Sequence, residues 1–230
     1  MMLSLDDLRL TQDGFTLALS GDVAAGERVA LLGASGSGKS TLLSLIAGFD
    51  WPDRGRILWD GQEITRAPVA GRPVSILFQD GNLFPHLTVV DNVALGLRPD
   101  LRLSEADRAR VEDALARVGL AGLGGRNPAA LSGGQQARVA LARMLLRDRP
   151  LALLDEPFAA LDPGLKTEML ALVRELCVDR GLTLIMACHD LRDAERLCDR
   201  LWLLEDGAKV LDVALEGLRD APPGVLRAWL

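Results

Sequence analysis

Long apolar runs, a basic N-terminal segment and a full set of paired cysteines are all missing from this 230-residue sequence. Without about 18 consecutive apolar residues, no segment is expected to span a bilayer. Residues 1–7 are neither basic nor strongly apolar, so we expect no export signal. The three cysteines, Cys177, Cys188 and Cys198, lack metal-ligand spacing and predict reduced thiols. We therefore expect a cytoplasmic chain.

An excess of positive charge is missing too, because 26 basic residues face 32 acidic ones and the net charge is −6. Binding along a phosphate backbone usually requires basic patches, so the composition disfavours nucleic acid as a partner. Arginines between Arg102 and Arg117 are interspersed with acidic residues, which is typical of a solvated helix face. The remaining composition, 49% hydrophobic and 25% charged, indicates a globular protein large enough for one α/β domain with an insertion.

Short apolar segments alternate with helical patterns along most of the chain. The segments with strand character are 28–32, 56–59, 74–78, 151–154 and 182–186. Helical patterns at 41–46 and 165–177 lie between them, and this alternation predicts an α/β fold with a mostly parallel sheet. The first 31 residues instead predict antiparallel β-hairpin structure, and Asp206-Gly207 after an apolar run predicts a final hairpin.

Residues 88–147 have a different character, which predicts an inserted α-helical subdomain. Ser104 is a candidate cap for a helix that continues to Val118, and a second helix begins at Ser132. We therefore predict a single domain over 1–230. Its core comprises 1–87 and 148–230, and the helical subdomain comprises 88–147.

A glycine-rich phosphate loop is the first motif that carries chemistry. Gly33–Ser40 fits G-x-x-x-x-G-K-[ST] and lies between a predicted strand and a predicted helix, as that motif requires. Glycines let backbone N–H groups surround phosphate oxygens, and the helix N-terminus adds positive charge. Lys39 is expected to reach the β- and γ-phosphates, and the Ser40 hydroxyl to ligate Mg²⁺. The predicted nucleotide contacts are Gly33, Ala34, Ser35, Gly36, Ser37, Gly38, Lys39, Ser40 and Thr41.

Two carboxylates, Asp155 and Glu156, follow the apolar segment 151–154. Ligands of α/β sheets bind at the carboxyl ends of the strands. Because neighbouring residues of a strand point in different directions, the two acids need not share one role. We expect Asp155 to hold Mg²⁺ and Glu156 to act as general base towards the attacking water. An acidic pair that merely ends a strand is the alternative, which the upstream phosphate loop disfavours.

Gln79 and His189 each follow a predicted strand as well. A single histidine is more often structural than catalytic, but the strand end favours a contact with the γ-phosphate and the attacking water. The neutral amide of Gln79 is suited to Mg²⁺ or water without adding charge. His86 lies in a predicted loop and is interpreted as structural or interfacial.

A second Ser-Gly-Gly element occurs at Leu131–Gln135. Ser132 and Gln135 have the spacing of a capping box. Gly133 and Gly134 are expected to leave N–H groups of the first helical turn open, as in an anion site. Alone, this pattern would indicate an ordinary helix start. Beside a phosphate loop, it predicts a second phosphate contact that serves a nucleotide in another copy of the chain.

Together these motifs resemble the ATP-binding cassette (ABC) family over essentially the whole chain. The matching elements are Gly33–Ser40 as Walker A, Gln79 as Q-loop, Leu131–Gln135 as signature, Leu151–Glu156 as Walker B, Ala160-Leu161-Asp162 as D-loop and His189 as switch histidine. The resemblance implies a P-loop NTPase fold that hydrolyses ATP with Mg²⁺ held by Ser40, Gln79 and Asp155. It also implies a head-to-tail homodimer, in which Ser132–Gln135 and Asp162 contact the ATP of the partner chain.

The resemblance further implies docking under transmembrane permease subunits at the cytoplasmic face of the inner membrane. The contact groove is expected between the helical subdomain and the Gln79 region, and the full importer would include a periplasmic solute-binding protein. A stand-alone cassette favours the importer type. Segments 45–49, 78–89 and 135–143 most resemble the ATPases of thiamine importers, and also those of iron, sulfate and polyamine importers. Less favoured alternatives are a soluble cassette in DNA repair or translation and a P-loop metabolic kinase.

The sequence departs from the family at one position. The family usually places an aromatic residue, often Tyr, before Walker A to stack on adenine. This chain has no Tyr, and Leu10-Thr11-Gln12 stands in that neighbourhood. Phe15 is nearby, but its alternating strand pattern predicts a core position. We therefore expect weaker or less adenine-selective nucleotide binding.

Overall fold

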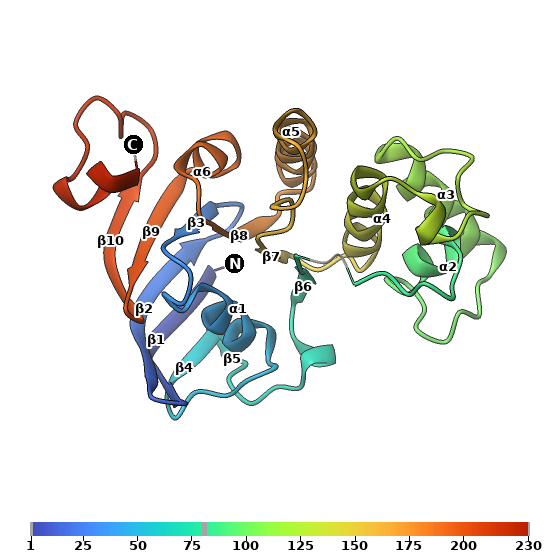
Figure 1. Ribbon diagram of the computed structural model, residues 1–230. Coiled ribbons are helices and arrows are strands. Elements are labelled where there is room, and N and C mark those ends of the chain that lie inside the picture. The colour runs from blue at the N-terminus through green and yellow to red at the C-terminus, as the bar shows by residue number, and fades with distance from the viewer. Residues whose placement is uncertain (1, 80–81, 230) are drawn as a thin grey trace.

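A ten-stranded mixed sheet dominates the computed structural model, which describes residues 2–79 and 82–229 (Figure 1). Its strands are β1 (Met2–Gln12), β2 (Phe15–Ala24), β3 (Arg28–Leu32), β4 (Arg54–Trp59), β5 (Gln62–Glu63), β6 (Val74–Leu77), β7 (Leu151–Asp155), β8 (Thr183–Cys188), β9 (Arg200–Glu205) and β10 (Ala208–Ala214). The helices are α1 (Lys39–Ala47), α2 (Val89–Ala94), α3 (Glu105–Arg117), α4 (Gly133–Leu146), α5 (Pro163–Arg180) and α6 (Leu191–Leu197). Short 3₁₀ helices lie at η1 (Val69–Gly71), η2 (Pro128–Ala130) and η3 (Gly224–Trp229).

The parallel half of the sheet has the order β9-β3-β8-β7-β6. Both of its faces are buried. In β3, Val29 and Leu31 pack in the same cluster as α1, whereas Ala30 and Leu32 pack in the cluster of the remaining helices. Burial on both faces explains the uninterrupted apolar runs of these strands. The predicted strands at 28–32, 74–78, 151–154 and 182–186 are confirmed as parallel, and their carboxyl ends share one edge of the sheet. The segment 56–59 forms β4, which instead pairs antiparallel with β1.

The antiparallel half has the order β5-β4-β1-β2, as expected for the N-terminal region. Asp13 and Gly14 join β1 to β2 with φ angles of 51° and 82°, the left-handed backbone of a tight hairpin turn. β10 closes the predicted last hairpin with β9 and also pairs parallel with β2 at Ala208 and Ala18. Both halves therefore belong to one continuous sheet.

The helices α2, α3 and α4 pack on one another and lie to one side of the sheet, apart from α1 (Figure 1). Capping boxes begin α3 at Ser104 and α4 at Ser132, as their sequence spacing predicts. The helices α2 and α6 have only 6 and 7 residues and were not predicted. Fewer than two turns carry too little hydrophobic periodicity to identify a helix.

A buried arginine fixes the end of α1 that lies opposite the phosphate loop. Arg72 is 0% exposed, and its Nη1 donates hydrogen bonds to the carbonyl oxygens of Leu45 and Ile46 at 2.6 and 2.9 Å. Its Nη2 donates to the Thr65 carbonyl oxygen at 2.7 Å. The carbonyls of Leu45 and Ile46 belong to the last turn of α1, where a cation is favoured by the helix dipole. Arg72 thus anchors the helix that begins at the phosphate loop.

Candidate active site

The phosphate loop connects β3 to the first turn of α1. Gly38 precedes the helix with φ of 102°, and a Cβ there would lie 2.9 Å from Leu17 Cδ1 and 3.0 Å from Phe15 Cζ. Both the backbone angle and the lack of space therefore require glycine. Lys39 is 5% exposed, and its Nζ donates to the carbonyl oxygens of Gly33 and Ala34 at 2.8 and 3.1 Å. The ammonium group is held inside the loop that was predicted to surround phosphates.

Ser40 and Asp155 meet although they are far apart in the sequence. The Ser40 Oγ donates a hydrogen bond to Asp155 Oδ1 at 3.0 Å. Burial raises the pKa of the Asp155 carboxyl, and the neighbouring charge of Glu156 adds to this, while the Ser40 hydrogen bond and Lys39 lower it. A hydroxyl and a carboxylate side by side are oxygen donors of the kind that Mg²⁺ prefers. The residues present therefore fit the predicted cation.

Glu156 lies between a cation and the histidine. Its Oε1 is 3.6 Å from Lys39 Nζ, and its Oε2 is 3.2 Å from His189 Nδ1. The backbone of Glu156 has φ of 45°, the left-handed region, and its N–H donates to the Ala187 carbonyl oxygen at 3.2 Å. The chain leaves the extended conformation of β7 at this residue. Such a backbone is uncommon for a residue with a side chain and is frequent at functional sites.

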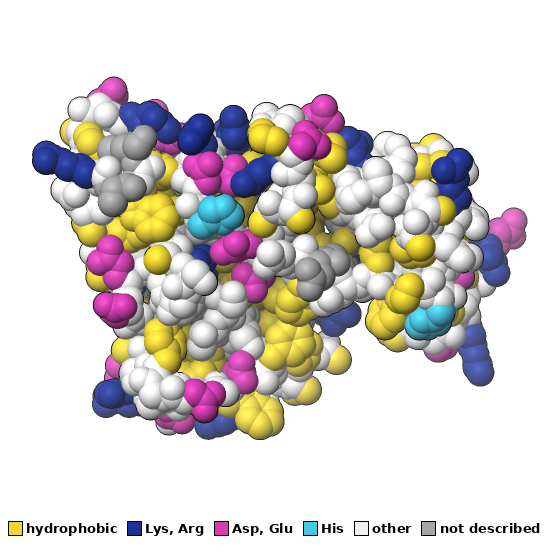
Figure 2. Space-filling view, viewed as in Figure 1, with side chains coloured by type: hydrophobic (Ala, Val, Ile, Leu, Met, Phe, Trp, Pro, Cys, Tyr) yellow, Lys and Arg dark blue, Asp and Glu magenta, His cyan; other side chains and the backbone are white. Residues whose placement is uncertain are grey.

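His189 follows β8 and is 54% exposed on its side chain, whereas Glu156 is 25% exposed. Figure 2 shows a histidine and several acidic side chains gathered near the middle of the face that it presents. The structure thus brings Lys39, Ser40, Asp155, Glu156 and His189 to the same sheet edge. A water-accessible imidazole beside a carboxylate and an ammonium group can contact both a phosphate oxygen and a water molecule.

Gln79 lies beyond the end of β6 and is exposed. It lines a hollow together with Gly133 at the start of α4 and Leu161 before α5. The predicted Q-loop, signature and D-loop elements therefore border one another within the chain. The segment after Gln79 includes residues 80 and 81, which lie outside the described residues.

The Ser132 element has the predicted capping box. Gln135 N–H donates to Ser132 Oγ at 3.3 Å, and Ser132 N–H donates to Gln135 Oε1 at 3.1 Å. Gly133 is exposed, whereas Gly134 is buried against Leu165 of α5. Within one chain, α4 lies away from α1 and the phosphate loop (Figure 1). This element therefore does not close the phosphate site of its own chain.

Asp162 begins α5 by accepting a hydrogen bond from Leu165 N–H at 3.0 Å on its Oδ1. The residue is exposed, so its second carboxylate oxygen can face another molecule. Asp162 is expected from the family resemblance to contact the ATP of a partner chain. The capping role was not foreseen, although Asp followed by Pro163 is a common helix start.

The place expected for an adenine-stacking aromatic holds Leu10, Thr11 and Gln12 at the end of β1, of which Thr11 and Gln12 are exposed. Phe15 packs against the apolar cluster around α1 but is only partly buried, so it lies at the edge of the core and not inside it. Its ring also lies against Gly38 of the phosphate loop.

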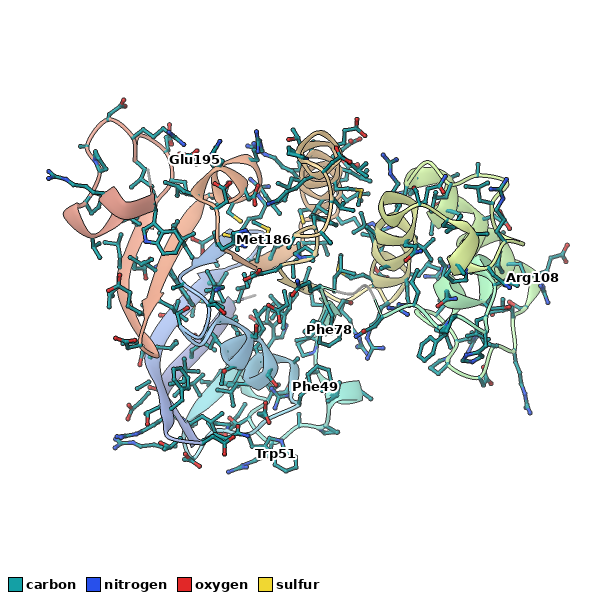
Figure 3. The ribbon with its side chains drawn as sticks, in the orientation of Figure 1. Phe49, Trp51, Phe78, Arg108, Met186 and Glu195 are labelled. Carbon is teal, nitrogen blue, oxygen red and sulfur yellow. The ribbon has the colours of Figure 1, made fainter. Side chains whose placement is uncertain are left out.

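A groove runs between the end of α1, β6 and the helices α2 and α4. Its lining includes Ala47, Phe49, Val69, Val74, Ser75, Ile76, Leu95, Gly96, Arg143, Met144 and Arg147. Phe49 is 49% exposed, and its ring centroid is 5.8 Å from that of Phe78, as the two labelled side chains in Figure 3 illustrate. Trp51 is exposed nearby in sequence. The groove lies between the helical subdomain and β6, whereas Gln79 lines the separate hollow beside Gly133.

Within residues 2–79 and 82–229, no helix has the length and apolar character needed to cross a membrane.

Known proteins resemble this chain over its whole length. A sequence model of the family described as ABC transporter matches residues 17–159. A thiamine import ATP-binding protein, ThiQ, of Jannaschia sp. (strain CCS1) is 63% identical to this chain over 229 residues. The match covers 100% of this chain and 100% of the relative. The protein of the same description from Yersinia pseudotuberculosis is 49% identical, covering 95% of this chain and 93% of the relative.

Solved structures show the same fold. The structure of cbiO1 from Clostridium perfringens, described as part of the ABC transporter complex cbiONQ, has a TM-score of 0.85 and 32% identity over 98% of this chain and 93% of its own. A dimeric structure of the ATP-binding cassette MJ0796 in a post-hydrolysis state, bound to ADP and Pi, has a TM-score of 0.79 and 30% identity. It covers 93% of this chain and 98% of its own.

Proposed function

Because this chain belongs to the ABC transporter family, we propose that it is the ATP-hydrolysing subunit of an importer for thiamine. The observation that carries the ATPase proposal is the meeting of Lys39, Ser40, Asp155, Glu156 and His189 at one sheet edge. Full-length similarity to proteins described as thiamine import ATP-binding proteins supports the solute. ATPases of iron, sulfate or polyamine importers are the alternatives of the same class, and a soluble non-transport ABC ATPase is less favoured.

The loop Gly33–Ser40 and Thr41, which follows it in the first turn of α1, bind the phosphates in this proposal. In the structure the Lys39 ammonium group donates to two carbonyl oxygens of this loop. Arriving β- and γ-phosphate oxygens carry more charge than carbonyls and compete for the same N–H donors. The dipole of α1 and the loop N–H groups add to the attraction.

Ser40, Asp155 and Gln79 would hold Mg²⁺. The cation neutralises charge on the β- and γ-phosphates when it is bound. Because a nearby cation stabilises a carboxylate, it would counteract the burial that raises the pKa of Asp155.

Hydrolysis requires a water oxygen to attack the γ-phosphorus while the bond to the ADP oxygen breaks. Glu156 accepts the water proton on its carboxylate. His189, 3.2 Å from Glu156, holds the side chain and contacts the γ-phosphate oxygens. Lys39 stabilises the negative charge on the phosphates.

A second chain completes the site in this proposal. Ser132, Gly133, Gly134 and Gln135, with Asp162, contact the ATP held by the partner's phosphate loop. The separation of α4 from α1 within one chain supports this arrangement, as does the dimeric state of a 30% identical cassette.

The proposed partners are two transmembrane permease subunits, which dock in the groove beside Phe49 at the cytoplasmic face of the inner membrane. A periplasmic solute-binding protein delivers the solute in the full system. The exposed side chain of Phe49, which lines the groove, supports a protein contact there. We also propose that 88–147 acts as the helical subdomain and that 1–87 with 148–230 acts as the nucleotide-binding core.

The test combines turnover with uptake. Glu156→Gln should bind ATP and Mg²⁺ but hydrolyse very slowly and accumulate a closed dimer, whereas Lys39→Ala should fail at nucleotide binding. In cells that produce the chain with its permease, labelled thiamine should accumulate only with the unaltered chain. Uptake of iron, sulfate or a polyamine in place of thiamine would overturn the solute, and near-normal turnover by Glu156→Gln would overturn the role of Glu156.

A further inference from the structure

An ion pair between Lys166 and Asp193 lies beside the candidate active site. Its two side chains are 19% and 6% exposed, which makes it the least exposed lysine–aspartate pair among the described ion pairs. Both residues line the same small cavity as Glu156 and His189. Figure 3 labels Met186, which also lines this cavity. Neither member of the pair belongs to the motifs of the sequence.

Each member is attached to a turn that carries an active-site residue. Lys166 lies in the first turn of α5, and its N–H donates to the carbonyl oxygen of Asp162 at 2.9 Å. Asp193 lies in the first turn of α6, and its N–H donates to the carbonyl oxygen of Asp190 at 3.1 Å. Asp190 caps α6 and directly follows His189. The pair therefore joins the turn of Asp162 to the turn of His189.

The charges around the pair make Lys166 the main partner of Asp193. The only other cation recorded with Asp193 in the described part of the chain is Arg196, whose Nη1 is 3.8 Å from Asp193 Oδ1 and whose side chain is 46% exposed. Solvent screens the attraction between a half-exposed arginine and a carboxylate at that distance, so Arg196 contributes little. A buried ion pair gives little net stability compared with apolar packing of the same volume. The pair instead fixes the orientation of the start of α6 relative to the start of α5.

We infer that Lys166 and Asp193 are positioning residues for ATP hydrolysis, which hold His189 in register with Glu156 and with the turn of Asp162. This inference rests on the proposed function of Glu156 and His189. His189 is more than half exposed, and its Glu156 contact alone does not fix the imidazole. The ion pair fixes the helix start next to it. Since Asp162 faces the partner's nucleotide in the proposed dimer, the same pair links the two ATP sites.

The experiment compares Asp193→Asn and Lys166→Met with the conservative variant Lys166→Arg. For each, kcat and KM for ATP, the Kd for MgATP and the thermal midpoint are measured. We expect the first two variants to lose about tenfold or more in kcat with little change in the Kd for MgATP, because the phosphate loop is untouched. Lys166→Arg keeps the positive charge opposite Asp193 and should retain most of the turnover.

Arg219→Met is the matched control. Arg219 pairs with Glu195 of the same helix α6 at 2.6 Å, and Glu195, labelled in Figure 3, does not line the cavity of Glu156. Its loss should leave kcat unchanged. If single variants fail to fold, Lys166→Met with Asp193→Leu restores apolar packing. A low kcat in that folded double variant supports the inference, and an unaltered kcat overturns it.

Two further outcomes would overturn the inference. One is a wild-type kcat in folded Asp193→Asn and Lys166→Met. The other is a loss of kcat in Lys166→Arg as large as the loss in Lys166→Met. The proposed function fails separately, when the unaltered chain shows no ATP hydrolysis or when Glu156→Gln hydrolyses ATP as fast as the unaltered chain.

Discussion

Gly134 of α4 packs so closely on Leu165 of α5 that an added Cβ would lie 2.1 Å from Leu165 Cδ2 and 3.1 Å from its Cγ. A side chain at this position would therefore displace the Leu165 side chain from the start of α4. This contact ties the start of α4 to the first turn of α5, next to Asp162. The two elements proposed to face the partner's nucleotide are held together by one apolar contact.

Gly134→Ala should destabilise the protein because the new methyl group forces Leu165 to move. Overpacking of this kind costs about 1–3 kcal/mol. In a chain of this size that corresponds to roughly 2–4 °C in thermal midpoint for each kcal/mol. Gly133→Ala is the matched control, since its nearest neighbour, Leu161 Cδ2, would be 3.9 Å away. Thermal denaturation of both variants measures the difference. The double variant Gly134→Ala, Leu165→Ala should recover part of the loss, and equal midpoints for the two single variants would contradict the packing argument.

Ser132→Arg should separate nucleotide binding from hydrolysis. The variant keeps its own phosphate loop and should bind ATP, but an arginine at the helix start obstructs the partner's nucleotide, so the homodimer should not turn over. Mixing it with Lys39→Ala chains should restore one working site in each mixed dimer, formed by the intact loop of one chain and the intact signature of the other. ATP binding and phosphate release are measured for each chain alone and for the mixture. A homodimer of Ser132→Arg with normal turnover would show that the site is complete within one chain.

Nucleotide selectivity should be low because no aromatic side chain occupies the end of β1. Thr11 and Gln12 are exposed there, and Phe15, which pairs with Gln12 across the hairpin, is partly buried against the apolar cluster around α1. Stacking of a base on an aromatic ring contributes about 1–3 kcal/mol in nucleic-acid complexes. We expect GTP to compete with ATP for binding at similar concentrations. Competition titrations with both nucleotides provide the measurement, and tight binding with strong preference for adenine would contradict this expectation.

The three thiols should be unreactive in the folded protein. Burial raises the pKa of Cys177 to about 11 and that of Cys188 to about 12, and it also raises the pKa of Cys198. Only the thiolate reacts with alkylating or disulfide reagents. We expect no modification at pH 8 until the chain is unfolded, when all three cysteines should react. Rapid labelling of the native protein would contradict their burial.

The same thiols should make stability depend on alkaline pH. The folded state keeps their protons above pH 9, where the unfolded chain releases them. Stability therefore falls as the pH rises, because the unfolded state binds fewer protons there. The stability that the protonated thiols contribute to the folded state is fully present below about pH 9. It is lost progressively towards pH 11 and above. Urea denaturation at pH 8 and pH 10.5 measures the change, and Cys177→Ala should reduce its slope.

Local chemistry explains which elements could be predicted. The phosphate loop and the caps at Ser104 and Ser132 each depend on a few consecutive residues. Their structures agree with prediction because the hydrogen bonds that define them close within three or four positions. By contrast, α2 and α6 were missed, since six or seven residues owe their helical form to packing on neighbours rather than to a pattern of their own.

Most strands, the phosphate loop and the residue types of the active site could be predicted from local patterns, because backbone geometry and capping are short-range. Only the tertiary structure decided that Glu156 lies between Lys39 and His189 and that Lys166 pairs with Asp193. It also decided that β10 joins both halves of the sheet. These contacts join residues from separate elements. Their distances follow from strand order and helix packing, which no local pattern specifies.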